Sequence, residues 1–189
     1  MADKETVLVV GAGQGLSASL ARLFASEGMN VAIAARNTDK LADLCSDTGA
    51  KAYACDAVDA AQVDALFAAV TADMGEPDVV VYNASNRARG PIQDLDTEAV
   101  RTAIEISCFG GFLVAQAAAK QMIARNKGTI LLTGASASVK GYPNSSSFAM
   151  GKFGLRGLAQ SLARELQPQN IHVAHFVIDG GINAGPGDE

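Results

Sequence analysis

The chain has 189 residues, of which 49% are hydrophobic, and its mean hydropathy is +0.16. This length and composition support one well-filled core, and therefore a single domain over residues 1–189. The net charge of −5 and the isoelectric point of about 5.0 exclude a basic stripe that neutralises phosphates, so we expect no nucleic-acid partner.

The opening segment, MADKETVLVV, has no cationic region followed by an apolar segment and a cleavage site, and no later apolar run reaches the length of a membrane span. We therefore expect a cytoplasmic protein without a membrane partner. The cysteines, Cys45, Cys55 and Cys108, are odd in number and widely spaced. They predict small core side chains, with neither a disulfide framework nor a metal site.

Short runs rich in β-branched residues alternate with longer alanine- and leucine-rich stretches of helical periodicity. The predicted strands are 6–10, 30–34, 51–55, 78–82, 129–133 and 171–178. The predicted helices are 15–27, 38–48, 60–74, 97–124 and 147–166. This alternation predicts an α/β fold with a doubly wound, Rossmann-like parallel sheet and helices on both faces. The glycine-rich tail after residue 178 leaves open whether this chain includes the last strand of such a fold.

The first strand is followed by three glycines, Gly11, Gly13 and Gly15, at the start of the first helix. Glycine suits a sharp turn at which a pyrophosphate approaches the backbone amides and the positive end of the helix. The dinucleotide spacing G-x-G-x-x-G would need glycine at position 16, which is Leu16 here. The alternatives are a tight turn without a ligand and the adenosylmethionine loop of a methyltransferase.

Arg36 follows the second strand in "AIAARN", and positions 34–37 contain no Asp or Glu. A carboxylate at this place would hold ribose hydroxyls, whereas a basic residue suits a 2′-phosphate. Arg36 therefore argues against a methyltransferase and predicts that NADP(H) is preferred over NAD(H).

These segments, together with later ones, resemble the short-chain dehydrogenase/reductase family over nearly the whole chain. The family's T-G-x-x-x-G-x-G is similar to residues 10–17, with the first Thr and the last Gly replaced, and its N-N-A-G is similar to "YNAS" at 82–85. Its Asp after the third strand matches the Asp in "ACDAVD". Besides Arg36, the resemblance implies that the cofactor is held by Gly11, Gln14, Gly15, Leu16, Asp56, Ala57, Asn83, Ala84, Lys152 and Ile182.

The catalytic signature departs from the family pattern at its tyrosine. The family's Y-x-x-x-K is "FAMGK" here, so that Phe148 stands in the place of the tyrosine and Lys152 keeps the place of the lysine. The family's helix Asn, which helps to hold a proton-relay water, falls at Ser107. Its serine after the fifth strand falls at Ser138, with Ser136 as a rival. The resemblance implies that these positions form the catalytic site.

Carbonyl reduction needs a hydride on carbon and a proton, or a strong hydrogen bond, on the developing oxyanion. In the family the tyrosine supplies this proton or hydrogen bond, and the neighbouring lysine lowers the pKa of the tyrosine. Phe148 cannot supply a proton, and Tyr142 is a candidate substitute for the missing tyrosine. The resemblance implies that Lys152 still binds the ribose of the nicotinamide. The plain alternatives are a packed ring at Phe148, a solvated helix lysine at Lys152 and a turn-forming hydroxyl at Ser138.

The sequence therefore predicts an NADP(H)-dependent oxidoreductase that transfers a hydride between the nicotinamide and a small carbonyl or alcohol, with weakened activity. The alternative is a catalytically silent nucleotide-binding protein of the same fold, a sensor or a partner subunit. The resemblance also implies a homodimer or homotetramer formed through the helices 97–124 and 147–166. His172 and His175 lie in one strand, away from any serine elbow, and are interpreted as hydrogen-bonded strand residues.

Overall fold

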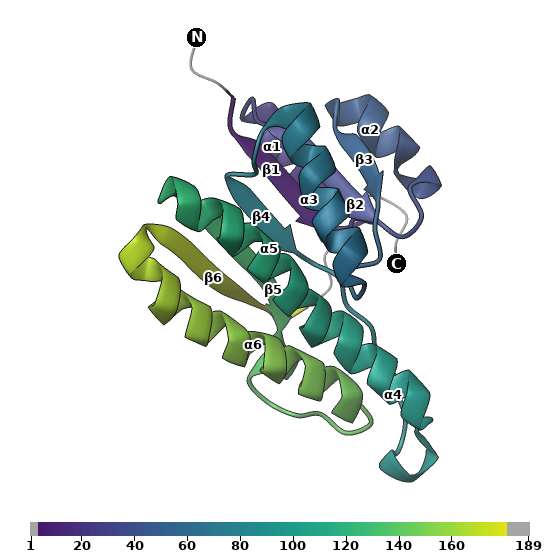
Figure 1. Cartoon of the computed structure of the whole chain (residues 1–189). Helices are drawn as coiled ribbons and strands as arrows, with labels where there is room; N and C mark the ends of the chain where they lie inside the picture. The colour runs from purple at the N-terminus through teal and green to yellow at the C-terminus, as the bar shows by residue number, and fades with distance from the viewer. Residues whose placement is uncertain (1–3, 181–189) are drawn as a thin grey trace.

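The computed structural model describes residues 4–180, which form a six-stranded parallel sheet. The strands are β1 Thr6–Val10, β2 Asn30–Ala35, β3 Lys51–Ala54, β4 Val79–Tyr82, β5 Gly128–Ala135 and β6 Ile171–Ile178. Their order across the sheet is β3-β2-β1-β4-β5-β6, so the winding reverses between β1 and β4 (Figure 1). The predicted doubly wound α/β fold is confirmed. The question of a last strand concerns the tail after residue 180, which lies outside the described residues.

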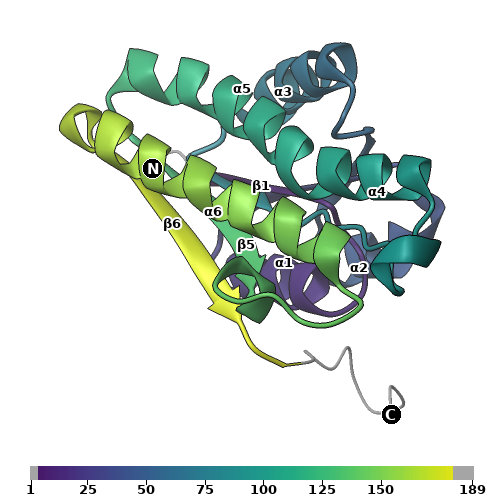
Figure 2. The same cartoon turned by 90° about the horizontal axis from the view of Figure 1, so that it is seen from below.

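Helices cover both faces of the sheet. They are α1 Leu16–Ser26, α2 Ala42–Thr48, α3 Ala60–Met74, α4 Thr97–Ile104, α5 Gly110–Arg125 and α6 Ser146–Leu166. Successive side chains of a strand point to opposite faces. Val7 and Val9 therefore pack in the cluster beneath α1 and α2, whereas Leu8 and Val10 pack in the cluster beneath α3, α5 and α6. Figure 2 shows α1 and α2 on one side of the sheet and α3 and α5 on the other. This two-sided burial explains why the strands are almost uninterrupted apolar runs.

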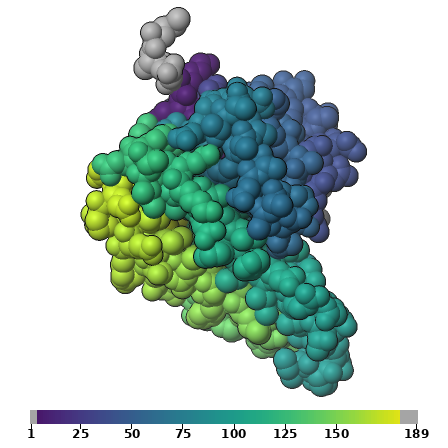
Figure 3. Space-filling view, in the orientation of Figure 1, coloured from purple at the N-terminus to yellow at the C-terminus, as the bar shows by residue number. Residues whose placement is uncertain are grey.

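Two predicted helices begin or continue differently in the structure. The predicted helix 38–48 opens with a 3₁₀ turn, η1 Asp39–Leu41, because the Asn37 side chain accepts a hydrogen bond from the Asp39 amide and forms a turn there. The predicted helix 97–124 is divided by a π-helical turn, η3 Glu105–Phe109, between α4 and α5. The space-filling view shows that the α4 end projects from the rest of the molecule (Figure 3).

A close approach to β4 accompanies the π turn. The hydroxyl of Tyr82, which is fully buried, donates a hydrogen bond to the carbonyl of Ile106 within η3. Directly after the turn, a Cβ at Gly110 would lie 2.5 Å from the Tyr82 hydroxyl oxygen and 3.0 Å from the Ala57 carbonyl oxygen. Glycine at this position therefore lets α5 pack closely over the end of β4.

The helical segment Thr97–Arg125 contradicts the expectation that no apolar segment reaches the length of a membrane span. It has 29 residues and reaches a mean hydropathy of 1.4 over 18 of them, so by length and composition alone it could cross a membrane. The sequence did not predict this property, because polar residues interrupt the apolar residues along the segment. In the fold, side chains of α5 such as Val114 and Met122 are buried against the sheet, as in a core helix.

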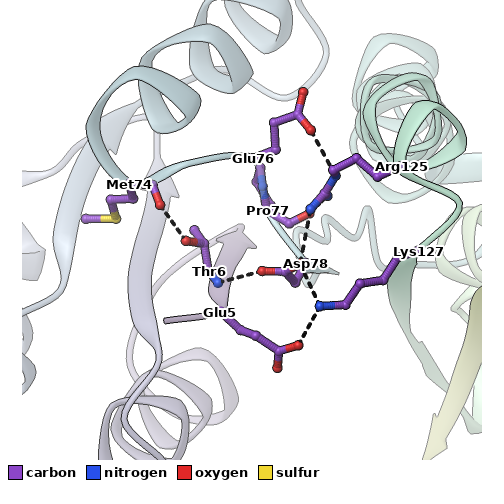
Figure 4. Close-up of polar contacts among 8 residues, drawn as sticks. All are labelled: Glu5, Thr6, Met74, Glu76, Pro77, Asp78, Arg125 and Lys127. Atoms are coloured by element: carbon purple, nitrogen blue, oxygen red, sulfur yellow. Dashed lines mark hydrogen bonds and ion pairs between the residues drawn. The ribbon is translucent and has the colours of Figure 1, made fainter. Parts of the chain in front are cut away.

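A group of ion pairs joins the amino ends of β1 and β4 to the end of α5 (Figure 4). Arg125, at the end of α5, lies 3.1 Å from a carboxylate oxygen of Asp78, and Lys127 lies 3.3 Å from the same oxygen. The other oxygen of Asp78 accepts a hydrogen bond from the Thr6 amide at 3.0 Å. Burial alone would raise the pKa of Asp78, but these partners together hold it below its ordinary value. The amino edge of the sheet is thereby fixed, opposite the edge at which the strands end.

Replacing Gly110 with alanine should destabilise the fold by about 1–3 kcal/mol, because the added methyl group meets the Tyr82 hydroxyl and a backbone carbonyl. Gly157→Ala is the matched control, since nothing lies within 4 Å of a Cβ at this exposed position of α6. That variant should gain about 0.5–1 kcal/mol from helix propensity. Urea denaturation midpoints measure both changes. Shifts of the two variants in the same direction would contradict the packing account.

Candidate active site

The carboxyl ends of β1, β2, β3 and β4 border a cavity of about 600 Å³, which we call the first cavity. It lies where the winding of the sheet reverses, the place at which open α/β sheets bind ligands. Its lining includes five predicted cofactor residues besides Gly11, namely Arg36, Asp56, Ala57, Asn83 and Ala84. The structure therefore brings together residues from four separate strand ends.

The glycine loop forms one wall of the first cavity. Gly11 has a φ of +87°, and a Cβ there would lie 2.2 Å from the Ala84 amide nitrogen, so only glycine fits. The Ser17 hydroxyl donates to the Gly11 carbonyl at 3.0 Å and accepts from the Asn83 side-chain amide at 2.7 Å. The sequence reading missed Ser17, because its role depends on a partner 66 residues away. The loop and the end of β4 are thus joined directly.

The remaining residues of the glycine loop are placed differently. Gly15 has a φ of +82° and precedes the first turn of α1, and Leu16 begins that helix. Leu16 lines a second cavity, described below, whereas Gln14 is exposed and lines neither cavity. Ile182 lies outside the described residues.

The far side of the first cavity is basic. Arg36, directly after β2, and Lys40, in η1, both line it, and Asp56 is the one carboxylate among its described lining residues. Asp56 accepts a hydrogen bond from the Val58 amide at 3.3 Å, which orients one carboxylate oxygen. Sequence reasoning found Arg36 but missed Lys40, because a lysine at the start of a helix carries no distinctive pattern.

A second cavity of about 260 Å³ adjoins the first and shares Asn83 and Ser85 with it. Phe148 and Lys152 of α6 line this second cavity together with the end of β5. The Lys152 ammonium lies 5.8 Å from the centroid of the Phe148 ring, as expected for residues one helical turn apart. The structure thus places the candidate catalytic pair at the open end of the candidate cofactor site.

Lys152 is buried, with only 3% of its surface exposed. Its ammonium donates one hydrogen bond, to the Thr133 carbonyl at 2.8 Å, and forms no ion pair within residues 4–180. Burial lowers the pKa of Lys152 to about 8, because a buried cation without a counter-ion is disfavoured. Lys152 is therefore not the solvated surface lysine that the sequence left open.

The candidate serines use their hydroxyls on the backbone. Ser138 is fully buried and accepts a hydrogen bond from the Ala135 amide at 3.0 Å, which closes the turn after β5. Ser107, in η3, is also fully buried and bonds both the amide and the carbonyl of Asn86, each at 3.1 Å. Neither serine lines the second cavity. The catalytic roles of Ser107 and Ser138 stay predictions. Each serine does form hydrogen bonds to the backbone, as the alternative of a structural hydroxyl expects.

Tyr142 lies outside the second cavity and is 38% exposed. The Ser136 hydroxyl and the Lys140 ammonium hold the pKa of Tyr142 below its ordinary value.

His175 differs from the sequence interpretation, because its Nε2 is buried without a hydrogen-bond partner in the described part of the chain. The ring fits there because position 134 is glycine, where a Cβ would lie 2.2 Å from Nε2. Burial lowers the pKa of His175, and the cations of Arg156 and Lys152 lower it further.

Phe148 has a second cationic neighbour that sequence reasoning missed. The guanidinium carbon of Arg87, from the connection between β4 and α4, lies 4.1 Å from the ring centroid. This distance is typical of a cation–π contact. Nothing in the local sequence predicts it, because the two residues are 61 positions apart and meet only when α6 packs beside the loop.

The fold and the two cavities define a dinucleotide-binding α/β protein, and comparisons with known proteins identify its family. The family model described as "short chain dehydrogenase" matches residues 5–184. The chain therefore belongs to the short-chain dehydrogenase family, whose members are oxidoreductases that act on alcohol and carbonyl substrates with nicotinamide cofactors.

Individual relatives agree with this family. D-threitol dehydrogenase of Mycolicibacterium smegmatis is 30% identical over 176 residues, which cover 90% of this chain and 68% of the relative. A short-chain dehydrogenase structure from Rhodopseudomonas palustris is 38% identical, with a TM-score of 0.87, and the match covers 92% of this chain and 84% of that one.

Two further similar structures contain cofactors. An actinorhodin polyketide ketoreductase with NADPH is 27% identical, with a TM-score of 0.89, and the match covers 93% of this chain and 70% of that one. An NAD⁺-bound xylitol dehydrogenase is 29% identical, also with a TM-score of 0.89, and the match covers 95% and 72% of the two chains. Relatives of similar likeness thus differ in the cofactor that they contain.

The burial of Lys152 should make stability depend on pH. The unfolded lysine keeps its proton up to about pH 10.4, whereas the folded one loses it near pH 8, so the wild type gains stability as the pH rises through this window. Lys152→Met should lack this gain, and the exposed Lys120→Met on α5 should keep it. Chemical denaturation of the three proteins between pH 7 and pH 10 measures the difference. Parallel curves for wild type and Lys152→Met would contradict the lowered pKa.

Proposed function

We propose that this chain is an NADP(H)-dependent oxidoreductase that transfers a hydride between the nicotinamide and a small carbonyl or alcohol, with activity weakened by Phe148. The observation that carries the proposal is the second cavity, which places Lys152 and Phe148 beside Asn83 at the end of the first cavity. A volume of about 260 Å³ suits a small substrate, since ligand pockets usually enclose roughly 300–1,000 Å³.

The residues present fit a nicotinamide dinucleotide. The Gly11 position has no room for a Cβ, so the loop is built for close backbone approach, and the buried Lys152 ammonium has donors left after its bond to Thr133. Gly11, Asp56, Asn83 and Lys152 would hold the cofactor along the two cavities. When bound, the nicotinamide supplies or accepts the hydride.

The preference for NADP(H) rests on the basic side of the first cavity. Arg36 and Lys40 both line it, and Asp56 is the one carboxylate among the described lining residues. A guanidinium pairs well with a phosphate through charge-assisted hydrogen bonds. This charge distribution supports a 2′-phosphate ligand.

The weakened activity follows from the groups available to protonate the substrate oxygen. Phe148 has no proton to give, and the Ser138 hydroxyl is buried outside the second cavity. Lys152 lines the cavity and has a pKa of about 8, so its ammonium can stabilise the developing oxyanion near neutral pH. A lysine already engaged with Thr133 and the cofactor is a poorer donor than a dedicated phenol.

A catalytically silent nucleotide-binding protein is the second candidate. The contact that favours it is the one between Arg87 and Phe148, because a guanidinium 4.1 Å from the ring centroid covers part of the residue that would face the substrate. Such a protein would keep the cofactor residues and lack turnover.

A homodimer or homotetramer through α4, α5 and α6, and a cytoplasmic location, stay part of the proposal. Large apolar side chains of this region are exposed, with fractions of 41% for Phe112, 55% for Met150 and 44% for Phe153. Exposed apolar groups of this size on neighbouring helices support an interface between subunits.

Arg36→Ala should weaken NADPH binding about tenfold and leave NADH binding unchanged, because only NADPH carries the phosphate that the guanidinium would pair with. The effect is modest because Arg36 is exposed and solvent screens the pair. Fluorescence titration of both cofactors against both proteins measures it. Equal affinities of the wild type for NADPH and NADH would remove Arg36 from this role.

Phe148→Tyr should raise the rate of carbonyl reduction by at least about tenfold, since a positioned general acid contributes roughly 10²–10⁴-fold. The added phenol lies on the ring beside Lys152, whose positive charge favours the phenolate and lowers its pKa. Single-turnover NADPH oxidation with an activated carbonyl, at several pH values, measures the rate.

Phe153→Tyr, at an exposed position of the same helix, is the control and should change nothing. A gain confined to Phe148→Tyr, with a new pH-dependent limb, would support an intact scaffold that lacks only its acid. No gain despite unchanged cofactor affinity would contradict this explanation. Wild-type turnover at ordinary enzyme rates would contradict the weakened activity itself.

A further inference from the structure

The loop between β4 and α4 is fixed on both sides of Arg87. Ser107 bonds the amide and the carbonyl of Asn86, each at 3.1 Å. Ser147 of α6 bonds the carbonyl of Ala88 at 2.7 Å and its amide at 3.0 Å. Both serines are fully buried, so neither bond competes with bulk water. The backbone that carries Arg87 is therefore held in one place rather than free as in most surface loops.

The Arg87 guanidinium lies over the Phe148 ring and keeps its donors. It lies 4.1 Å from the centroid of the Phe148 ring, and Phe148 lines the second cavity. Stacking uses the face of the guanidinium, while its N–H groups point outward in the plane. Within residues 4–180, the Arg87 side chain forms no ion pair and no hydrogen bond, and only its backbone amide donates, to the Asn86 side chain at 2.7 Å.

The second cavity, which the Phe148 ring borders, carries positive charge. The described residues that line the second cavity include the Lys152 ammonium and no carboxylate. The charges that act on His175 of β6, beside Lys152, are the cations of Arg156 and Lys152. A cavity that has one cationic side chain and no anion in its described lining, with Arg87 against one of its lining rings, suits a ligand that supplies a negative charge.

We propose that Arg87 binds a carboxylate of the substrate, so that the preferred substrates are small oxo acids and the corresponding hydroxy acids. The planar guanidinium can pair with a carboxylate through two parallel hydrogen bonds, while Phe148 fixes its orientation from one face. Phe148 then acts as the platform that positions Arg87. The inference rests on the proposed oxidoreductase function and names its substrate class.

The kinetic test compares 2-oxo acids of four to six carbons with their uncharged methyl esters, using NADPH and the whole chain. The wild type should prefer each acid over its ester. Arg87→Gln should lower kcat/KM for the acids by about tenfold or more, mainly through KM, and leave the esters within about twofold. Arg87→Lys should retain part of the preference, and the control Arg89→Gln, on the same loop, should retain all of it. Circular dichroism checks that each variant is folded.

A binding measurement separates this inference from the proposed function. Oxamate, a carboxylate that resembles a 2-oxo acid but that this reaction cannot reduce, should bind the NADPH-saturated wild type in calorimetry and bind Arg87→Gln at least about tenfold more weakly. Equal oxamate affinity of the two proteins, or an unchanged acid-to-ester ratio in Arg87→Gln, would overturn the role of Arg87 while leaving reduction of neutral carbonyls intact. If no carbonyl is turned over at all, the proposed function fails, and the oxamate titration still decides whether Arg87 binds a carboxylate.

Discussion

The contact between the glycine loop and the end of β4 is the constraint on which the rest of the site depends. A Cβ at Gly11 would lie 2.2 Å from the Ala84 amide nitrogen, and the Asn83 amide reaches Ser17 at the start of α1. Both cavities border on Asn83. Because this single approach joins β1, α1 and β4, it forms the wall that the two cavities share, and any separation of the loops would open both.

Local charge in this protein differs from its overall charge. The chain carries a net charge of −5, yet its two cavities are lined by Arg36, Lys40 and Lys152, with Asp56 the one carboxylate among the described lining residues. The total charge therefore bears on extended polyanions such as nucleic acids and says little about a dinucleotide, which needs only a few cations at one place. Burial of Lys152 opposes folding, so this residue is better explained by binding than by stability.

Features encoded by local patterns could be predicted from the sequence. The strands, the glycine loop and the neighbourhood of Phe148 and Lys152 follow from apolar runs, backbone requirements and helical spacing. The π turn could not be predicted, because it accompanies a hydrogen bond between Tyr82 and a carbonyl 24 residues later. The position of Arg87 depends likewise on distant packing.

The sequence does not determine the roles of serine hydroxyl groups, because a serine that closes a turn and a serine that faces a substrate have the same sequence pattern. Ser107 and Ser138 each bond backbone groups, and Ser147, which no pattern singled out, fixes a loop. Their orientation depends on which backbone groups the packed helices leave near them, and only the assembled structure specifies that.

The π turn also sets the rotational phase of one helix against the next. A helix advances by 100° per residue, so the extra residue that η3 accommodates turns α4 relative to α5 by about this angle. In this arrangement the Ser107 hydroxyl reaches Asn86 and Gly110 faces Tyr82 at the same time. A one-residue deletion within η3 would keep the helix continuous and its composition nearly unchanged, yet it would turn the residues on one side of the deletion by about 100°, so that the helix could not keep both contacts.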